Sequence, residues 1–542
     1  MIMQKFPLSM HPKRQFARAN FVLLDGIFTY EVLPHFVIKE QLMNEINTPS
    51  SIGSAYGAKD VLPNKYLHMK RSFYIDEAFL LNDLIELHIL GLDQIAKVYI
   101  NDVLAIETSL PFYEQVVNVK KFLKIGDNEI YFIIKDDNLS SMYAKGYQDY
   151  ERSKNTIPSL SGIINYLYLE GLNKVHLKNY EAKYDAKTRQ LKFNFDIIGS
   201  FDRGSVELYE NGVCRHVEHF KDYSCSIDCK NLKEYSFDNP NVYDLVIKVD
   251  NDLVFSTITL LDVSVSIDDR HHPYLLFNGK KNKLHGFVDF GFDEISGLTR
   301  PIEKVKKMYR HLKQDGFNLV IFHNCIPSYA LLDFLDHLGF VYIIGALSNG
   351  NDMKTYAKIY EKFASYPFLK DRSGRLGRNK GRNYEQFEKE CIALIESFAV
   401  SNNNIAYNLY FKGEGQLYAS GLTNRLDKMY PNSLFLSTFG AFDQMCGDIF
   451  CPNIKYINWK LRNDHSRVLF ASFMNMSTKR LVKNAKKLKK ISHEENISAF
   501  IYLPLMNLFD EKSFFDNNSY ELNESYSEYV NVIHVLNEEE EK

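Results

Sequence analysis

The chain has 542 residues, of which 45% are apolar and 25% are charged, and its 65 basic and 68 acidic residues leave a formal charge of −3. This length predicts roughly three to four domains of about 150 residues, with enough apolar side chains to build sizeable cores. The near-neutral charge balance gives no indication of a nucleic acid or an anionic membrane as a partner.

The cysteines and the N-terminus indicate a protein of a reducing compartment. Seven scattered cysteines are an odd set in a long chain, which argues against a disulfide framework. Two pairs of cysteines lie close in the sequence, Cys225 with Cys229 and Cys446 with Cys451. Neither has a second pair or a clustered histidine nearby, so we expect plain thiols, no metal and no cofactor. The N-terminal residues show no apolar signal segment, and no stretch of 18 apolar residues appears, so we expect a cytoplasmic protein.

The first half of the chain is predicted to form two β-domains. Between residues 66 and 135, short alternating segments such as "DLIELHILGL" and "AKVYINDVLAIE" are separated by turn residues. A second series, including "QLKFNFDIIG" and "SVELYENGVC", extends over about 90 residues, which is the size of an immunoglobulin-like sandwich. We place these two domains at residues 1–173 and 174–268.

The remaining residues, 269–542, show a different pattern. Helix-period segments such as "IEKVKKMYRHLKQDG" alternate with short apolar runs such as "FNLVIFH" and "FVYIIGAL". Such alternation predicts parallel βα units, and the length suits a single eightfold (β/α) barrel. In these barrels the chemistry lies at the carboxyl ends of the strands.

Several segments resemble glycoside hydrolase family 2, the family of β-galactosidases and β-glucuronidases. They are "HPKRQFARANFVLLDGIFTY", "GLDQIAKVYINDVLAIE", "SLSGIINYLYLEG" (with Ile164 where the family has Trp), "YLLFNGKKNKLHGFVDFG" and "GFNLVIFHNCIPSYALLDFLDHLGFVYI". The resemblance covers nearly the whole chain. It implies a jelly-roll β-sandwich like those that bind sugars, an immunoglobulin-like sandwich and a TIM barrel, in this order.

The resemblance also locates the acid/base of a retaining glycosidase. "YNLYFKGEGQ" resembles the segment that carries it, with Tyr407 at the family's Trp and Lys412 at its Glu. A lysine with a pKa of about 10.4 is a poor proton donor and cannot return as a carboxylate base. Glu414 is the one catalytic candidate, because on an extended strand it would lie on the same face as Lys412. It is a weak candidate, because it would lie about 6.5 Å further along the strand.

The second carboxylate of the family's mechanism also has no counterpart. Retaining glycosidases need two carboxyl groups about 5 to 5.5 Å apart. In "RVLFASFMNM", Ser472 stands at the nucleophile's position, and no Asp or Glu occurs between His465 and Ser492. Without a carboxylate here, a glycosyl-enzyme ester cannot form by the family's route.

Other positions of the substrate site match the family in part. The resemblance makes Asp289, His323 and Asp448 candidate substrate contacts, whereas Ile321 replaces an Arg and Gly345 replaces an Asp of the family. A histidine satisfied within the protein and aspartates that cap turns are equally open interpretations of the three matches.

We therefore interpret the chain as a noncatalytic family 2 relative, a pseudoenzyme of carbohydrate metabolism that binds a glycan or a partner protein. Replacing carboxylates by Lys412 and Ser472 makes the barrel mouth more positive, so an acidic or phosphorylated sugar is the expected ligand, which Tyr407, Lys412 and Ser472 would contact. Two alternatives stay open. One is an active retaining β-glycosidase that uses Glu414 with a displaced carboxylate, and the other is a pure protein-interaction scaffold with a filled barrel mouth.

Overall fold

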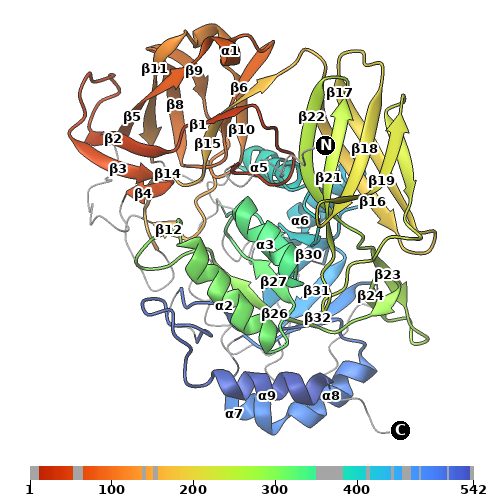
Figure 1. The fold of residues 1–542 in the computed structure, drawn as a ribbon. Helices are drawn as coiled ribbons and strands as arrows, with labels where there is room; N and C mark the ends of the chain where they lie inside the picture. Colours follow the sequence, from red (N-terminus) through yellow and green to blue (C-terminus); the bar gives the residue numbers. More distant parts are fainter. Residues whose placement is uncertain are drawn as a thin grey trace.

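The structure, a computed structural model, has two β-domains placed side by side above a barrel (Figure 1). It describes residues 11–52, 65–136, 142–149, 157–348, 383–409, 415–440, 445–453, 466–474, 476, 478–508 and 512–537. The predicted fold class is confirmed, with two antiparallel domains followed by a closed barrel of eight parallel strands.

The first domain is a sandwich of two main antiparallel sheets. One has the order β3 (Asn44–Thr48), β2 (Gly26–Leu33), β5 (Tyr66–Ile75), β11 (Gly126–Lys135), β8 (Ile95–Ile100) and β9 (Val103–Glu107), and the other has β1 (Phe21–Leu23), β15 (Leu167–Leu172), β6 (Leu84–Ile89) and β10 (Gln115–Asn118). Alternate residues of β6, namely Ile85, Leu87 and Ile89, are buried against the facing sheet, as a period of two requires.

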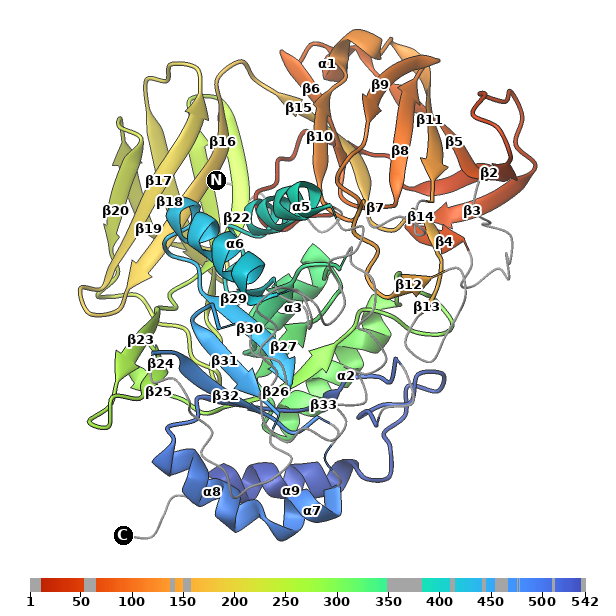
Figure 2. The same ribbon diagram turned by 180° about the vertical axis from the view of Figure 1, so that it is seen from behind.

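Short elements complete this domain at its two ends. They are β4 (Ser50–Ile52), β14 (Ser161–Ile163) and β7 (Leu92–Asp93) in one sheet, the pair β12 (Gln148–Asp149) and β13 (Ile157–Pro158), and the helix α1 (Glu77–Leu80) at the other end. The β12–β13 pair lies beside the barrel in both ribbon views, so this edge of the first domain faces the barrel (Figures 1 and 2).

The second domain is a smaller sandwich. Its sheets are β16 (His176–Asp185), β17 (Gln190–Ile198) and β20 (Ser224–Asp228), facing β19 (Val213–Phe220), β18 (Gly204–Glu210), β21 (Val242–Val249) and β22 (Asp252–Thr259). A small sheet of β23 (Val263–Ile267), β24 (Pro273–Phe277) and β25 (Lys280–Lys281) leads to the barrel. The domain limits predicted after residues 173 and 268 fall between β15 and β16 and inside the β23–β24 hairpin, and they stay predictions.

The barrel strands follow one another in chain order. They are β26 (Leu284–Asp289), β27 (Leu319–Phe322), β28 (Val341–Gly345), β29 (Asn404–Asn408), β30 (Phe435–Gly440), β31 (Ile449–Pro452), β32 (Val468–Ser472) and β33 (Ala499–Pro504). Gly345 ends β28 where a Cβ atom would lie 2.4 Å from the carbonyl oxygen of Phe322, so only glycine fits between these strands.

Helices surround the barrel. They are α2 (Ile302–Gln314), α3 (Tyr329–Leu338), α5 (Tyr384–Ser397), α6 (Gln416–Met429), α7 (Thr478–Lys483), α8 (Ala485–Glu494) and α9 (Tyr526–Asn537). Ser328 caps α3 by accepting a hydrogen bond from the Leu331 N–H, and Gly339 ends it in the left-handed region with a φ of 86°. Figure 2 shows α7, α8 and α9 on the side of the barrel away from the β-domains. No helix within the described ranges is long and apolar enough to cross a membrane.

Candidate functional site at the barrel mouth

The direction of each side chain at the barrel mouth follows from the alternation along the strands. Ile321 and Phe470 belong to the apolar cluster that fills the barrel, whereas Phe322 and Ala471 belong to the cluster between the barrel and its helices. Because successive residues point to opposite faces, His323 and Ser472 continue the inward rows of β27 and β32.

An imidazole and an amide meet at this mouth. Asn408, the last residue of β29, is 1% exposed, and its Nδ2 donates to His323 Nδ1 at 2.9 Å. The His323 backbone N–H donates to the Asp289 carbonyl oxygen. Asn408 Oδ1 is buried with no hydrogen-bond donor among the residues that the structure describes. The sequence-based prediction found His323 but missed Asn408, although an Asn at the end of a buried strand is a usable signal.

Aromatic rings flank this pair. The centroid of the Tyr147 ring lies 6.3 Å from the His323 ring and 5.7 Å from the Phe290 ring, and Phe290 lies 6.2 Å from His323. Tyr147 comes from the first domain and Phe290 from the loop after β26, so two domains shape the mouth. Phe292 and Leu508 belong, with Phe290, to the apolar cluster that fills the barrel.

Ser472 ends β32 and is 1% exposed. Its Oγ accepts a hydrogen bond from the Met474 N–H at 3.4 Å. The hydroxyl is therefore held by its own loop. A neutral hydroxyl here cannot serve as the carboxylate nucleophile of a retaining mechanism.

Asp289 ends β26, but its carboxylate points towards the helix layer. Oδ2 accepts from Arg300 Nη2 at 2.8 Å and from the Tyr309 hydroxyl at 2.7 Å, and Oδ1 accepts from the Gly291 N–H at 2.9 Å. Burial would lower the pKa of the Arg300 guanidinium, but Asp289 raises it above its usual range. These contacts are those of a structural carboxylate, and its predicted role as a substrate contact stays a prediction.

Tyr407 and Asp448 lie away from the mouth. The Tyr407 hydroxyl donates to the Ile395 carbonyl of α5 at 3.3 Å, and burial raises its pKa. Asp448 precedes β31 and therefore lies at the amino end of that strand, where its Oδ2 accepts from the Phe435 N–H at 2.8 Å. Burial raises the pKa of Asp448. The structure does not bring either residue to His323 and Asn408.

The remaining predicted site residues, Lys412 and Glu414, lie outside the described residues, which resume at Gly415. Their roles stay predictions. Ile321 is fully buried inside the barrel, so the position where the family has an Arg contributes an apolar group. Within the described ranges, no group of three or more His, Cys, Asp and Glu side chains is arranged to hold a metal ion.

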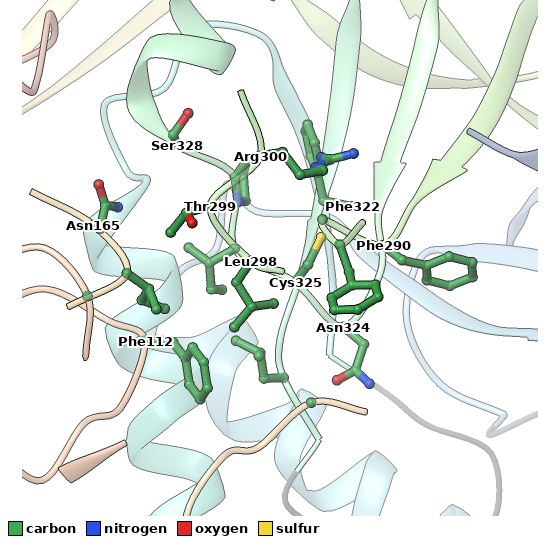
Figure 3. A pocket seen from close by; sticks show the side chains of 18 of the residues that line it. Phe112, Asn165, Phe290, Leu298, Thr299, Arg300, Phe322, Asn324, Cys325 and Ser328 are labelled. Carbon is green, nitrogen blue, oxygen red and sulfur yellow. The ribbon is translucent and has the colours of Figure 1, made fainter. Parts of the chain in front are cut away.

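A cavity of about 280 Å³ opens beside this mouth, between the first domain and the barrel (Figure 3). Phe112 and Asn165 of the first domain face Leu298, Arg300 and Asn324 of the barrel loops across it. Its described lining includes none of His323, Asn408 or Ser472, so the cavity lies off the barrel axis. Sequence reasoning did not find it, because it is formed by segments more than 100 residues apart.

Comparisons with known proteins agree with this architecture. Residues 43–165 match the family described as glycosyl hydrolase 2 galactose-binding domain-like. A β-galactosidase of Streptococcus thermophilus is 23% identical over 213 residues, which are 37% of this chain and only 20% of that enzyme.

Solved structures match over almost the full length. A β-D-glucuronidase of Dictyoglomus thermophilum has a TM-score of 0.72 at 15% identity, covering 96% of this chain and 97% of that one. A β-glucuronidase of Ruminococcus gnavus has a TM-score of 0.74 at 14% identity, covering 96% and 98%. At such identities the likeness establishes the fold alone.

The predicted resemblance to glycoside hydrolase family 2 is thus confirmed. The sequence of the first domain matches the family model, and the fold of the whole chain matches the solved β-glucuronidase structures.

Proposed function

We propose that this chain is a noncatalytic relative of glycoside hydrolase family 2 that binds a carbohydrate at the barrel mouth. One observation carries the proposal. The inward-facing groups described at the strand ends include an imidazole, amides and a buried hydroxyl, whereas the Asp289 carboxylate is turned outward and paired with Arg300. Glycoside hydrolysis with retention needs two carboxyl groups on either side of the glycosidic bond.

The barrel mouth is suited to binding a carbohydrate without hydrolysing it. The Tyr147 ring is partly exposed beside the His323 ring and offers an apolar face on which a sugar ring can pack. An acidic or phosphorylated sugar is the ligand that Lys412 favours, since a lysine is a good partner for a carboxylate or a phosphate. This class of ligand, and a cytoplasmic location, stay predictions.

Hydrolysis of a panel of aryl β-glycosides tests the proposal. We expect no release of the aryl group above a buffer control at any pH from 4 to 8. The competing possibility is an active retaining β-glycosidase with Glu414 as its acid. Turnover that is lost in Glu414→Gln would establish that alternative, whereas turnover that survives this substitution would come from a contaminating hydrolase.

A further inference from the structure

The side-chain amides of the cavity between the first domain and the barrel all use their oxygens within the protein. Asn165 Oδ1 accepts from the Tyr166 N–H at 2.9 Å, and Asn324 Oδ1 accepts from the Ser348 N–H at 2.7 Å. Because a backbone N–H needs an acceptor, these bonds fix which end of each amide is the oxygen. The amino group is the end that each amide has left for other partners.

Among the residues that the structure describes, neither Asn165 Nδ2 nor Asn324 Nδ2 has a hydrogen-bond acceptor. Asn324 is 5% exposed and has a left-handed φ of 59°, so the fold holds this amide in place. In Figure 3 the two amides stand on opposite sides of the cavity. Neither amino group is shut off from solvent, so both are donors that the acceptor oxygens of a bound ligand can reach.

The charges around the cavity point to an anion. Its described lining contains two basic residues, Lys145 and Arg300, and no Asp or Glu. Asp289, which is not part of the described lining, pairs with Arg300 through Nη2 at 2.8 Å. The N-terminal ends of α2 and α3 also contribute to the lining, with Ile302 and the capping residue Ser328, and helix N-termini favour negative charge.

The remaining lining suits a ring-shaped ligand. Phe112 is 3% exposed and Tyr166 is half-buried, and both line the cavity. Aromatic faces pack well against the C–H groups of a sugar or another small ring. A volume of about 280 Å³ lies near the lower limit of ligand pockets, which suits a molecule of monosaccharide size.

We propose that this cavity binds a small, monosaccharide-sized molecule through an oxyanion, either a carboxylate or a phosphate, whose oxygens accept hydrogen bonds from Asn165 and Asn324. The inference rests on the proposed function only in placing a carbohydrate ligand at this end of the barrel. Hydrolysis tests that function, whereas the experiment below measures binding alone, so either can fail without the other.

Calorimetric titration and thermal unfolding of the full chain test the site, with four probes: inorganic phosphate, glucose 6-phosphate, glucuronate and glucose. Asn324→Asp and Asn165→Asp each replace a donor by a negative oxygen while keeping the oxygen that accepts the backbone N–H. Asn211→Asp is the matched control, because Asn211 is an exposed Asn with a φ of 52° in the turn before β19. If Asn324→Asp does not fold, the binding measured for Asn165→Asp tests the proposal.

We expect at least one anionic probe to bind and to raise the melting temperature, with glucose at least tenfold weaker. Each cavity variant should weaken that probe at least tenfold, and Asn211→Asp should leave it unchanged. Binding of glucuronate alone identifies a carboxylate ligand, and binding of either phosphate probe identifies a phosphate. The proposal is overturned if no anionic probe binds the folded protein, if glucose binds as tightly, or if the cavity variants bind as the native chain does.

Discussion

Two buried polar regions of this molecule use their hydrogen-bonding groups in opposite ways. Where the two β-domains meet, Arg18 donates to both oxygens of Asp252, to Glu170 at 2.8 Å and to the Leu177 carbonyl. In the cavity beside the barrel, the amino groups of Asn165 and Asn324 have no acceptor within the described part of the chain. Saturated groups hold domains together, whereas unsaturated donors mark a place that a ligand can complete.

The largest effect is expected from breaking the saturated region. Arg18→Gln leaves Asp252 and Glu170 buried without their cation, and removing one partner of such a pair costs about 3 to 5 kcal/mol. Urea unfolding should show this loss in the transition that includes the β-domains. Arg310→Gln is the control, because Arg310 is exposed on α2. A loss below about 1 kcal/mol for Arg18→Gln would mean that the junction does not depend on this pairing.

Acid should weaken the same region next. His11 packs against Tyr168 at the domain junction, and burial lowers its pKa from 6.5 to about 4. Because the folded protein binds fewer protons than the unfolded chain between these values, stability is complete above pH 6.5 and falls as the pH drops towards 4. Between pH 7 and 5 we expect His11 to account for a loss of about 2 kcal/mol.

The variant His11→Asn isolates this contribution. Urea midpoints of the native chain and of the variant, each compared between pH 7 and 5, should differ because the variant lacks the titrating ring. The measurements stay above pH 4.5, because below this value Glu114 also contributes to the pH dependence of stability. Burial would raise the pKa of Glu114, but Lys13 and His88 lower it to about 2. Equal pH dependence in both proteins would show that His11 titrates normally.

The smallest effect is expected in the cavity. Asn324→Asp keeps the oxygen that accepts the Ser348 N–H and replaces a donor that no described residue uses by a negatively charged oxygen at the cavity, so the free energy of unfolding should fall by less than about 2 kcal/mol. Thermal unfolding without added ligand measures this. A loss as large as that of Arg18→Gln would place Asn324 with the structural groups and remove the contrast between the two regions.

The sequence predicted the fold well, because its signals are local. Alternation in segments such as residues 84–89 predicted strands, and the Gly after residues 302–315 predicted a helix end, which the structure places at Gln314. The barrel strand β31 and the helix α9 were not predicted as elements. Four residues between turns carry too little periodicity to be recognised as a strand.

The candidate site was predicted less completely, because side-chain direction depends on register. Asp289 and Tyr407 lie on barrel strands as expected, but both face the helices. Asp448 is a predicted substrate contact, but it precedes β31 and so lies at the amino end of that strand. A shift of one residue turns a side chain to the other face, and no sequence motif fixes that shift. The amides of the cavity depend on contacts between domains and were missed for the same reason.

The central claim, that the family's covalent chemistry is absent, is tested most directly by intact-protein mass spectrometry. The chain is incubated with activated 2-deoxy-2-fluoro-β-glycosides, including an acidic one, which trap the glycosyl-enzyme ester of retaining glycosidases. We predict an unchanged protein mass, because Ser472 is the residue that the resemblance assigns to the position of the carboxylate nucleophile, and its hydroxyl accepts a hydrogen bond from the Met474 N–H. A mass increase of one glycosyl unit, mapped to an Asp or Glu at the barrel mouth, would contradict this account.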